Sequence, residues 1–367
     1  MKGFSAQTGH AGCTVEKKLE TERNSCMTPQ FYVAAMSDRP DGGIYRYEMR
    51  EKAAPPVQVG FTPMPNVNYL AFSPDRKYLY STCTVDGHAG VASFAVDADG
   101  SLTFLSSMTS GGKAACYVIT DPSGKFLYCA NYLTGDFAEF RLESGRIVEQ
   151  TKLVRHEGHG PNAARQEGPH THFTNMTPDG KYLIVIDLGV DAVFTYRIDP
   201  EKGLDATSPN VLKVAPGDGP RHLVFDRSGK IAYLANELGN SVTALSYSDG
   251  EFKIIGKVTT LPRFWQGDTK VAAIRLSADE RYLFASNRGF DSIAVFELDG
   301  KGGMKPSDMV LSGGSSPRDI NFLPGGEWFG AANEFSDVVV FFDYDGKGKL
   351  TPNGFTLKLP RPLHIFW

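Results

Sequence analysis

Several protein classes leave sequence signatures that are absent here. No segment of the 367 residues approaches the roughly 18 consecutive apolar residues of a membrane-spanning helix. The net charge is −4, so the chain lacks the excess of lysine and arginine that marks a nucleic-acid-binding protein. There is no Cys-X-X-Cys pair, no haem-attachment motif and no Gly-X-Ser-X-Gly nucleophile motif. We therefore expect no membrane partner, no nucleic-acid partner and no cofactor.

The cysteines and the N-terminal segment give no indication of disulfide bonds or of secretion. The chain has an odd number of cysteines: Cys13, Cys26, Cys83, Cys116 and Cys129. The last three have apolar neighbours, which predicts buried free thiols and a reducing, cytoplasmic location. Residues 1–28 are polar and lack the apolar core of a secretory signal. We expect them to form a disordered extension, or to follow an upstream start codon, with Met27 the natural first residue.

One pattern occurs six times and predicts the architecture. It consists of an apolar run, a tight turn and a second apolar run, as in AFSPDRKYLYSTC, ITDPSGKFLYCAN, NMTPDGKYLIVID, VFDRSGKIAYLAN, RLSADERYLFASN and NFLPGGEWFGAAN. The residues after the turn are separated by 48, 56, 49, 51 and 46 positions: Lys77, Lys125, Lys181, Lys230, Arg281 and Glu327. A period of about fifty residues, with several short strands per period, is typical of propeller blades.

The two ends of the chain complete one further blade. The segment from Phe31 resembles the second and third strands of a repeat but has no first strand, and the C-terminal LPRPLHIFW resembles a first strand alone. Pairing the two closes the ring and protects its edge strands. We predict an all-β fold, a single domain over residues 29–367, forming a seven-bladed β-propeller whose N- and C-terminal strands share one blade.

Two positions of the repeat vary in a way that suggests function. The first position lies nine residues before the residue that follows the turn. In the six repeats it is occupied by Asn68, Cys116, His172, Arg221, Ala272 and Arg318. After the Asn or Asp that ends the second strand in most copies, they have Thr84, Tyr132, Leu188, Glu237, Arg288 and Glu334. In an antiparallel hairpin both positions lie at the same end, on the rim of the channel.

His172, Arg221, Glu237 and Arg288 should therefore converge on one sector. Individually, each would more often be a solvated charge, and an Arg–Glu pair there could be a simple ion pair. Because Glu237 is the one carboxylate at the matching position of these repeats, we expect at least one of the two arginines to be uncompensated and available to a ligand. We also expect replacement of His172 or Glu237 by alanine to cost little stability, because both lie on the rim of the channel.

The longest repeat contains an inserted loop, VRHEGHGPNAARQEGPHTH, at residues 154–172. Its histidines are His156, His159, His170 and His172. A zinc site is one interpretation, but no cysteine or aspartate accompanies them and a loop rich in glycine and proline makes a poor rigid cage. We expect no metal, and instead a substrate-binding loop with Arg165, Gln166 and His170 as contacts.

Four segments together resemble a known family: RQEGPHTHFTNMTPDGKYLIVIDLG, PGDGPRHLVFD, AYLANELGNSV and YLFASNRGFDSIAVF. With the repeats, they make the chain from about Phe31 to Trp367 similar to the lactonase family of seven-bladed propellers. That family includes bacterial propeller-type 6-phosphogluconolactonase and fungal carboxy-cis,cis-muconate cyclase. The resemblance implies that the family's pocket residues are His172, Arg221, Glu237 and Arg288, which the repeat comparison also selected.

The resemblance implies hydrolysis of a small anionic sugar lactone, first of all 6-phosphoglucono-δ-lactone. His172 would take a proton from water, with Glu237 orienting it or acting as the base itself. Arg221 and Arg288 would bind a phosphate, a carboxylate or the developing oxyanion, and Arg318 is a candidate third cation. Two alternatives stay open: a cyclase or hydrolase of another carboxylated lactone, and a non-catalytic interaction propeller.

Overall fold

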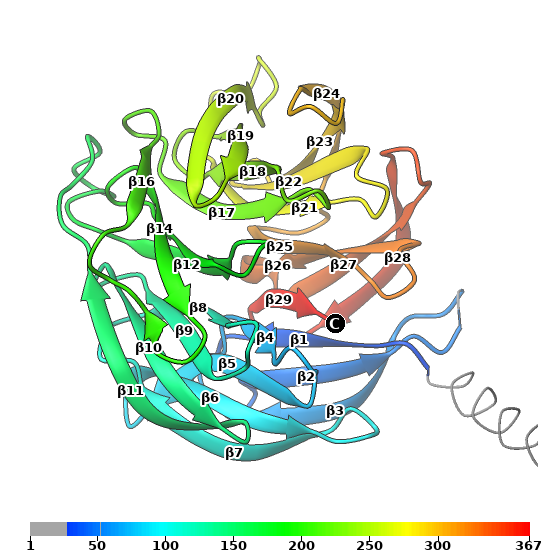
Figure 1. Ribbon diagram of the computed structural model, residues 1–367. Coiled ribbons are helices and arrows are strands. Elements are labelled where there is room, and N and C mark those ends of the chain that lie inside the picture. The colour runs from blue at the N-terminus through cyan, green and yellow to red at the C-terminus, as the bar shows by residue number, and fades with distance from the viewer. Residues whose placement is uncertain (1–27, 52) are drawn as a thin grey trace, which may run out of the picture.

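The protein is a closed ring of seven β-sheets around a central channel (Figure 1), as seen in a computed structural model that describes residues 28–51 and 53–367. The predicted all-β seven-bladed propeller is confirmed. The expected extension at residues 1–28, except Thr28, lies outside the described residues, as do Cys13 and Cys26. Cys83, Cys116 and Cys129 are buried free thiols, as expected.

Each of the first four blades runs from an inner strand at the channel to an outer strand. In that order, blade 1 contains β29 (Pro362–Phe366), β1 (Gln30–Ala35), β2 (Gly43–Glu48) and β3 (Val57–Pro63). Blade 2 contains β4 (Leu70–Phe72), β5 (Tyr78–Val85), β6 (His88–Val96) and β7 (Leu102–Thr109). Blade 3 contains β8 (Ala115–Thr120), β9 (Phe126–Asn131), β10 (Asp136–Glu143) and β11 (Arg146–Arg155). Blade 4 contains β12 (Thr171–Met176), β13 (Tyr182–Asp187) and β14 (Ala192–Asp199), with β15 (Gly203–Leu204) and β16 (Asn210–Lys213) both paired to β14.

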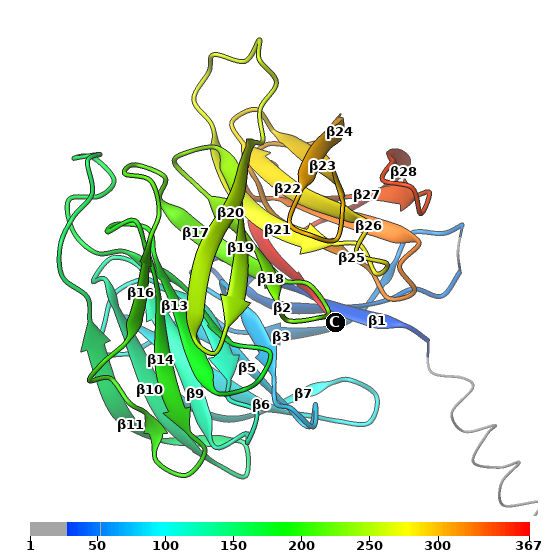
Figure 2. The ribbon, with the colours of Figure 1, turned by 45° about the horizontal axis from the view of Figure 1, so that its top comes forward.

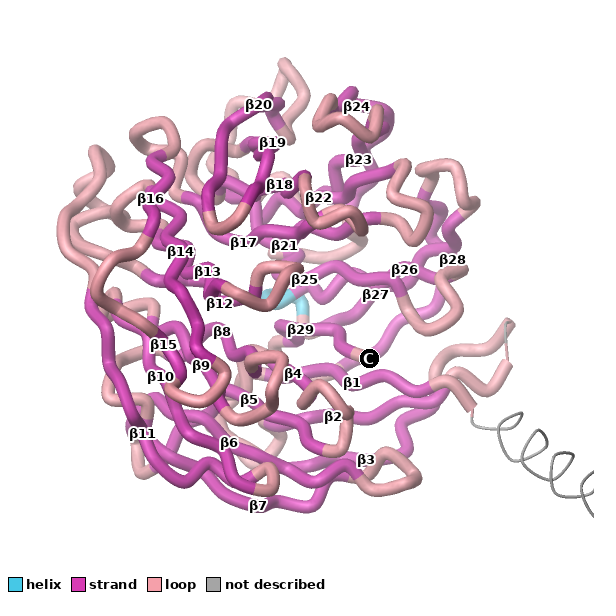
Figure 3. The backbone as a smooth tube through the Cα atoms, viewed as in Figure 1, coloured by secondary structure: helices cyan, strands magenta, loops and turns pink. Residues whose placement is uncertain are grey.

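The remaining blades have four strands each. Blade 5 contains β17 (Pro220–Phe225), β18 (Ile231–Asn236), β19 (Ser241–Ser248) and β20 (Glu251–Thr259). Blade 6 contains β21 (Lys270–Leu276), β22 (Tyr282–Arg288), β23 (Ser292–Leu298) and β24 (Met304–Leu311). Blade 7 contains β25 (Pro317–Phe322), β26 (Trp328–Asn333), β27 (Val338–Tyr344) and β28 (Leu350–Lys358). Figure 3 shows that strands and loops dominate, with one short 3₁₀ helix, η1 (Glu334–Ser336), in the described part of the chain.

The ring closes by pairing its two ends. Strand β29 runs antiparallel to β1, with Val33 opposite Ile365, and both side chains are fully buried. Figures 1 and 2 show β29, in red, next to β1, in blue. The split seventh unit predicted from the sequence is therefore confirmed. Pairing covers the edge of β1 and the edge of β29 that would otherwise be exposed.

The turn between the first two strands of a blade is held by its own side chains. In blade 3, Asp121 Oδ1 accepts the backbone N–H groups of Lys125, at 2.9 Å, and of Phe126, at 2.8 Å. Gly124 in this turn has φ of +70°, a left-handed conformation that glycine adopts without strain. These contacts explain why Asp, Pro, Ser and Gly recur in the repeat.

Side chains fill the central channel. The Tyr69 hydroxyl donates a 2.8 Å hydrogen bond to the Tyr117 hydroxyl, and its ring stacks on His364, with ring centroids 3.7 Å apart. His222 of β17 meets Tyr69 edge-on across the channel. Arg275 and Asp319 form an ion pair there at 2.6 Å. No helix within residues 28–51 and 53–367 has the length and apolar character needed to cross a membrane.

Candidate active site

A β-bulge places the predicted site residues. The pairing register shifts at the start of β12, β17 and β25, at the positions of His172, Arg221 and Arg318. A bulged residue has no partner in the ladder, so its side chain departs from the regular alternation of the strand. The same type of bulge therefore orients the side chains of His172, Arg221 and Arg318 in three different blades.

Glu237 gathers three arginines around one carboxylate. It follows Asn236, the last residue of β18, and its Oε2 lies 3.0 Å from Arg221 Nε and 2.6 Å from Arg288 Nη2. Its Oε1 accepts a hydrogen bond from Arg165 Nη2 at 2.7 Å. We call these four residues the Glu237 cluster. With three guanidinium groups on one carboxylate, the cluster carries an excess of positive charge.

This arrangement agrees with one expectation from the sequence. Arg221 and Arg288 share the single carboxylate of Glu237, which cannot neutralise both charges. Arg165, from the inserted loop, adds a third guanidinium group to the same carboxylate and increases the excess. The repeat comparison could not show this sharing, since Arg165 belongs to no repeat position.

The site is buried, which corrects the expectation that substitutions there cost little stability. His172, Arg221 and Glu237 are 5%, 2% and 3% exposed, so they belong to the packed interior. Arg165 and Arg288 have more accessible side chains, 28% and 14% exposed. Solvent and any ligand therefore approach the cluster from the side of Arg165 and Arg288, and substitutions of the buried members will cost stability.

The charges of the cluster support one another. Burial raises the pKa of Glu237, but Arg288 and Arg221 outweigh it and hold the pKa well below its usual value. Burial, together with the nearby Arg288, lowers the pKa of Arg221 to about 9, which leaves it protonated at neutral pH. Glu237 is therefore an ionised carboxylate engaged by arginines on both oxygens, which makes it a poor proton acceptor.

His172 is a neutral imidazole next to this cluster. Burial and the charge of Arg221 hold its pKa well below the ordinary value of 6.5. Its Nδ1 is buried and has no hydrogen-bond partner among residues 28–51 and 53–367. The rings of Tyr132 and His222 meet it edge-on, at centroid distances of 5.5 and 5.2 Å. Unlike the carboxylate oxygens of Glu237, His172 Nδ1 is not occupied by another group in the described part of the chain.

The inserted loop is anchored by His156 and by Gln166, which is one of its predicted substrate contacts. At its start, His156 Nδ1 lies 2.7 Å from Asp187 Oδ2 and its Nε2 lies 2.9 Å from the Tyr196 hydroxyl. Gln166, fully buried, donates hydrogen bonds from Nε2 to Leu188 O at 2.9 Å and to Asp191 Oδ1 at 2.8 Å. The Gln166 side chain thus holds the loop and does not line an open surface.

His170 is also engaged by protein groups. Its ring stacks on Tyr132, at a centroid distance of 4.6 Å, and its Nδ1 lies 2.9 Å from Tyr132 O. Of the three expected loop contacts, only Arg165 reaches the Glu237 cluster. The loop histidines are divided among separate environments, and no group of three or more metal-ligating side chains occurs within the described residues.

A second Arg–Glu pair lies beyond Arg288. Arg318 Nη1 is 3.4 Å from Glu334 Oε2, and Arg361 Nη2 is 2.6 Å from Glu334 Oε1. Glu334 and Arg361 were not selected from the sequence. Glu334 could have been, because it occupies the same repeat position as Glu237. Arg361 gave no such signal, because it precedes the closing strand and lies outside the compared positions.

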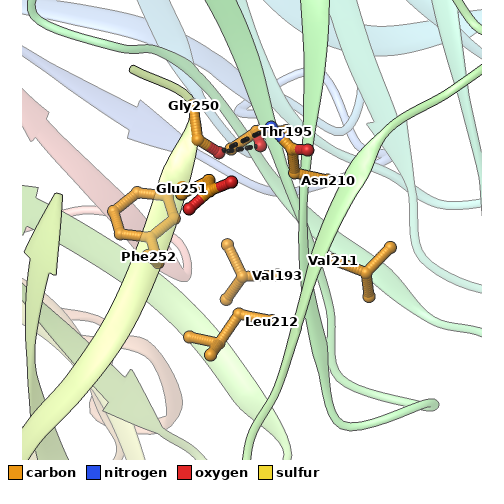
Figure 4. Close-up of a pocket in the computed structure, with 8 residues that line it drawn as sticks. All are labelled: Val193, Thr195, Asn210, Val211, Leu212, Gly250, Glu251 and Phe252. Atoms are coloured by element: carbon orange, nitrogen blue, oxygen red, sulfur yellow. Dashed lines mark hydrogen bonds between the residues drawn. The ribbon is translucent and has the colours of Figure 1, made fainter. Parts of the chain in front are cut away.

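A hollow of about 330 Å³ opens beside Arg288, between blades 6 and 7. Its lining includes Lys270, Arg288, Arg318, Glu334, Phe335 and Arg361. A different hollow, of about 230 Å³, lies between blades 4 and 5 and is lined by the eight residues labelled in Figure 4. Of these eight, Glu251 alone is titratable and none belongs to the Glu237 cluster. The chemistry therefore favours the hollow beside Arg288.

Three buried histidines predict acid sensitivity. Burial holds the pKa values of His172, His222 and His364 well below 6.5, so the folded protein stays unprotonated there while the unfolded chain takes up protons. Stability should be fully present above about pH 6.5 and fall below it, by up to about 4 kcal/mol per pH unit for three protons. Burial raises the pKa of Asp319, so protonation of this residue as the pH falls favours the folded state and offsets part of the loss. Denaturant unfolding between about pH 7.5 and 5.5 measures this, and equal midpoints across that range would contradict it.

The family follows from comparison with known proteins. Residues 30–367 match the model of the family described as "Lactonase, 7-bladed beta-propeller". An uncharacterised protein of Staphylococcus saprophyticus is 34% identical over 314 residues, 84% of this chain and 89% of that protein. Another, from Staphylococcus aureus, is 34% identical over 309 residues, 83% of this chain and 89% of that protein.

Two solved structures are similar over nearly the whole fold. One, from Bacteroides fragilis, was proposed to be a 6-phosphogluconolactonase; it has a TM-score of 0.86 and 33% identity, covering 92% of this chain and 97% of that chain. The other, a periplasmic gluconolactonase of Pseudomonas aeruginosa, has a TM-score of 0.84 and 27% identity, covering 92% of this chain and 98% of that chain. The chain thus belongs to the lactonase family of seven-bladed β-propellers.

Proposed function

We propose that this protein hydrolyses 6-phosphoglucono-δ-lactone to 6-phosphogluconate. The observation that carries the proposal is the neutral His172 beside the Glu237 cluster. A neutral imidazole can take a proton from water, and an excess of guanidinium groups can hold an anionic substrate and its oxyanion. These are the two requirements of water attack on a charged lactone.

In this mechanism His172 is the general base. Water attacks the lactone carbonyl carbon while His172 takes its proton, forming a tetrahedral oxyanion. The oxyanion then collapses, the ring C–O bond breaks, and the imidazolium returns its proton to the departing ring oxygen. Glu237 stays ionised throughout and orients the arginines, because both its oxygens are engaged by guanidinium groups.

Two arginine atoms are suited to stabilise the oxyanion. Arg165 Nη1 and Arg288 Nε are buried donors with no hydrogen-bond partner in the described part of the chain. Unpaired buried donors carry a desolvation cost that an oxyanion accepting their hydrogen bonds would relieve. Because Glu237 already fixes both side chains, they need little reorganisation when charge develops.

The phosphate in the proposed substrate rests on the charge excess and on the similarity to the Bacteroides fragilis protein. The Pseudomonas aeruginosa neighbour, a gluconolactonase, favours an unphosphorylated sugar lactone as the second candidate. Hydrolysis of the two lactones by the full chain, each corrected for spontaneous opening, distinguishes them. A higher kcat/KM for the phosphorylated lactone supports the proposal, and a higher value for gluconolactone favours the second candidate.

Replacing His172 with alanine should lower kcat about 10²-fold or more, because the base that accepts the water proton is removed. Steady-state kinetics on the preferred lactone measure this. His159→Ala is the matched control, since His159 is an exposed histidine of the same region and should leave kcat unchanged. If His172→Ala folds and retains wild-type kcat, His172 is not the base.

A further inference from the structure

The hollow beside Arg288 has a cationic wall of its own. Glu334 is 3% exposed and pairs with both Arg318 and Arg361, whose side chains are 21% and 45% exposed. One buried carboxylate therefore faces two accessible guanidinium groups. The second guanidinium charge is not neutralised by Glu334 and is open to an anion from solvent.

This wall repeats the geometry of the Glu237 cluster. In blade 7, Arg318 occupies the bulge and Glu334 follows the strand-ending asparagine, as Arg221 and Glu237 do in blade 5. Blade 6 lies between these two blades, and Arg288 occupies in it the repeat position that Glu237 and Glu334 occupy in theirs. The same two repeat positions therefore produce two Arg–Glu pairs. One is buried beside His172, and the other is open to the hollow.

Arg288 connects the two pairs. Its Nη2 lies 2.6 Å from Glu237 Oε2, and its side chain also lines the hollow that contains Glu334. Burial raises the pKa of Glu334, but Arg318, Arg361 and Arg288 together lower it, so the field of Arg288 reaches both carboxylates. A ligand in the hollow is thus adjacent to Arg288, one of the two arginines proposed to stabilise the oxyanion.

The charged residues that line the hollow sum to one positive charge. Four are cationic and three are acidic: Lys270, Arg288, Arg318 and Arg361 against Asp268, Asp291 and Glu334. Asp291 Oδ1 already accepts the backbone N–H groups of Gly289, at 3.0 Å, and Ser316, at 2.8 Å, so this carboxylate is engaged by the backbone. Phe335, 70% exposed, supplies an apolar side against which the carbon face of a sugar can rest.

We infer that the hollow binds the phosphate group of the substrate through Arg318 and Arg361, with the lactone ring extending past Arg288 toward the Glu237 cluster. This inference rests on the proposed function and adds the place of the phosphate. A phosphomonoester carries a charge of about −1.5 to −2 at neutral pH and offers three acceptor oxygens. It can therefore accept hydrogen bonds from two guanidinium groups at once more readily than a ligand carboxylate, which has two oxygens and a single charge.

The test compares Arg361→Gln and Arg318→Gln with Arg263→Gln in the full chain. Arg263 is an exposed arginine of the β20–β21 loop outside the hollow, so its substitution removes the same charge elsewhere. For each variant, kcat/KM is measured with the phosphorylated and the unphosphorylated lactone. The ratio of the two values should fall about 10- to 100-fold in Arg361→Gln and Arg318→Gln and stay constant in Arg263→Gln.

A binding measurement separates failure of the site from failure of the reaction. Inorganic phosphate is titrated into each protein by calorimetry, and its affinity should fall in Arg361→Gln but not in Arg263→Gln. Lactone hydrolysis with an unchanged ratio in both hollow variants overturns the phosphate site and leaves the lactonase proposal standing. No hydrolysis, together with phosphate binding weakened by Arg361→Gln, supports the site and overturns the lactonase proposal. Phosphate affinity equal in all variants overturns the site.

Discussion

Glu237→Gln should both destabilise the protein and inactivate it. The substitution keeps the size of the side chain but leaves Arg165, Arg221 and Arg288 without their shared carboxylate. Removing one partner of a buried ion pair typically costs about 3–5 kcal/mol, because the remaining charge is buried and unpaired. For a chain of this size that corresponds to a melting temperature lower by roughly 5 °C.

The activity of the same variant should fall at least about 10²-fold, because the arginines that we propose to bind the substrate and its oxyanion lose their orientation. Glu139→Gln is the matched control. Glu139 is also fully buried and pairs with Lys152 at 2.6 Å, but it lies in β10 of blade 3, away from His172. It should lose stability and keep kcat. Wild-type kcat in a folded Glu237→Gln protein would remove Glu237 from the site.

Deleting residues 360–367 should abolish the folded ring. The deletion removes β29, the inner strand of blade 1, and with it the buried side chains Leu363 and Ile365. It also removes the Ile365 N–H that Asp319 accepts at 2.8 Å and leaves β1 with an exposed edge. Each of these two side chains contributes about 1.5–3 kcal/mol of burial, so together they supply about 3–6 kcal/mol of a net stability of about 5–15 kcal/mol, before the lost strand pairing is counted.

Circular dichroism and thermal melting of the truncated chain measure this effect. Deletion of Trp367 alone is the control, because this residue lies beyond β29 and is 43% exposed. The shorter deletion should melt close to the full chain. A protein lacking residues 360–367 that melts like the intact chain would show that blade 1 does not need its C-terminal strand.

The sequence alone determined the architecture. Each repeat specifies its blade locally, through apolar strands and a turn fixed by residues such as Asp121 and Gly124. Because every blade has the same local pattern, the number of blades and the shared blade of β1 and β29 can be counted along the chain. Comparison of the repeats also selected His172, Arg221, Glu237 and Arg288, since divergence among equivalent positions is visible without a structure.

Only the tertiary structure decided how these residues are combined. Arg165 comes from an insertion and Arg361 from the segment before the closing strand, and neither position has a counterpart among the repeats that were compared. Their contacts with Glu237 and Glu334 depend on how loops cross between blades, which no local pattern encodes. Burial was likewise decided by packing: the bulges turn His172 and Arg221 into the ring, where surrounding side chains exclude water and shift their pKa values.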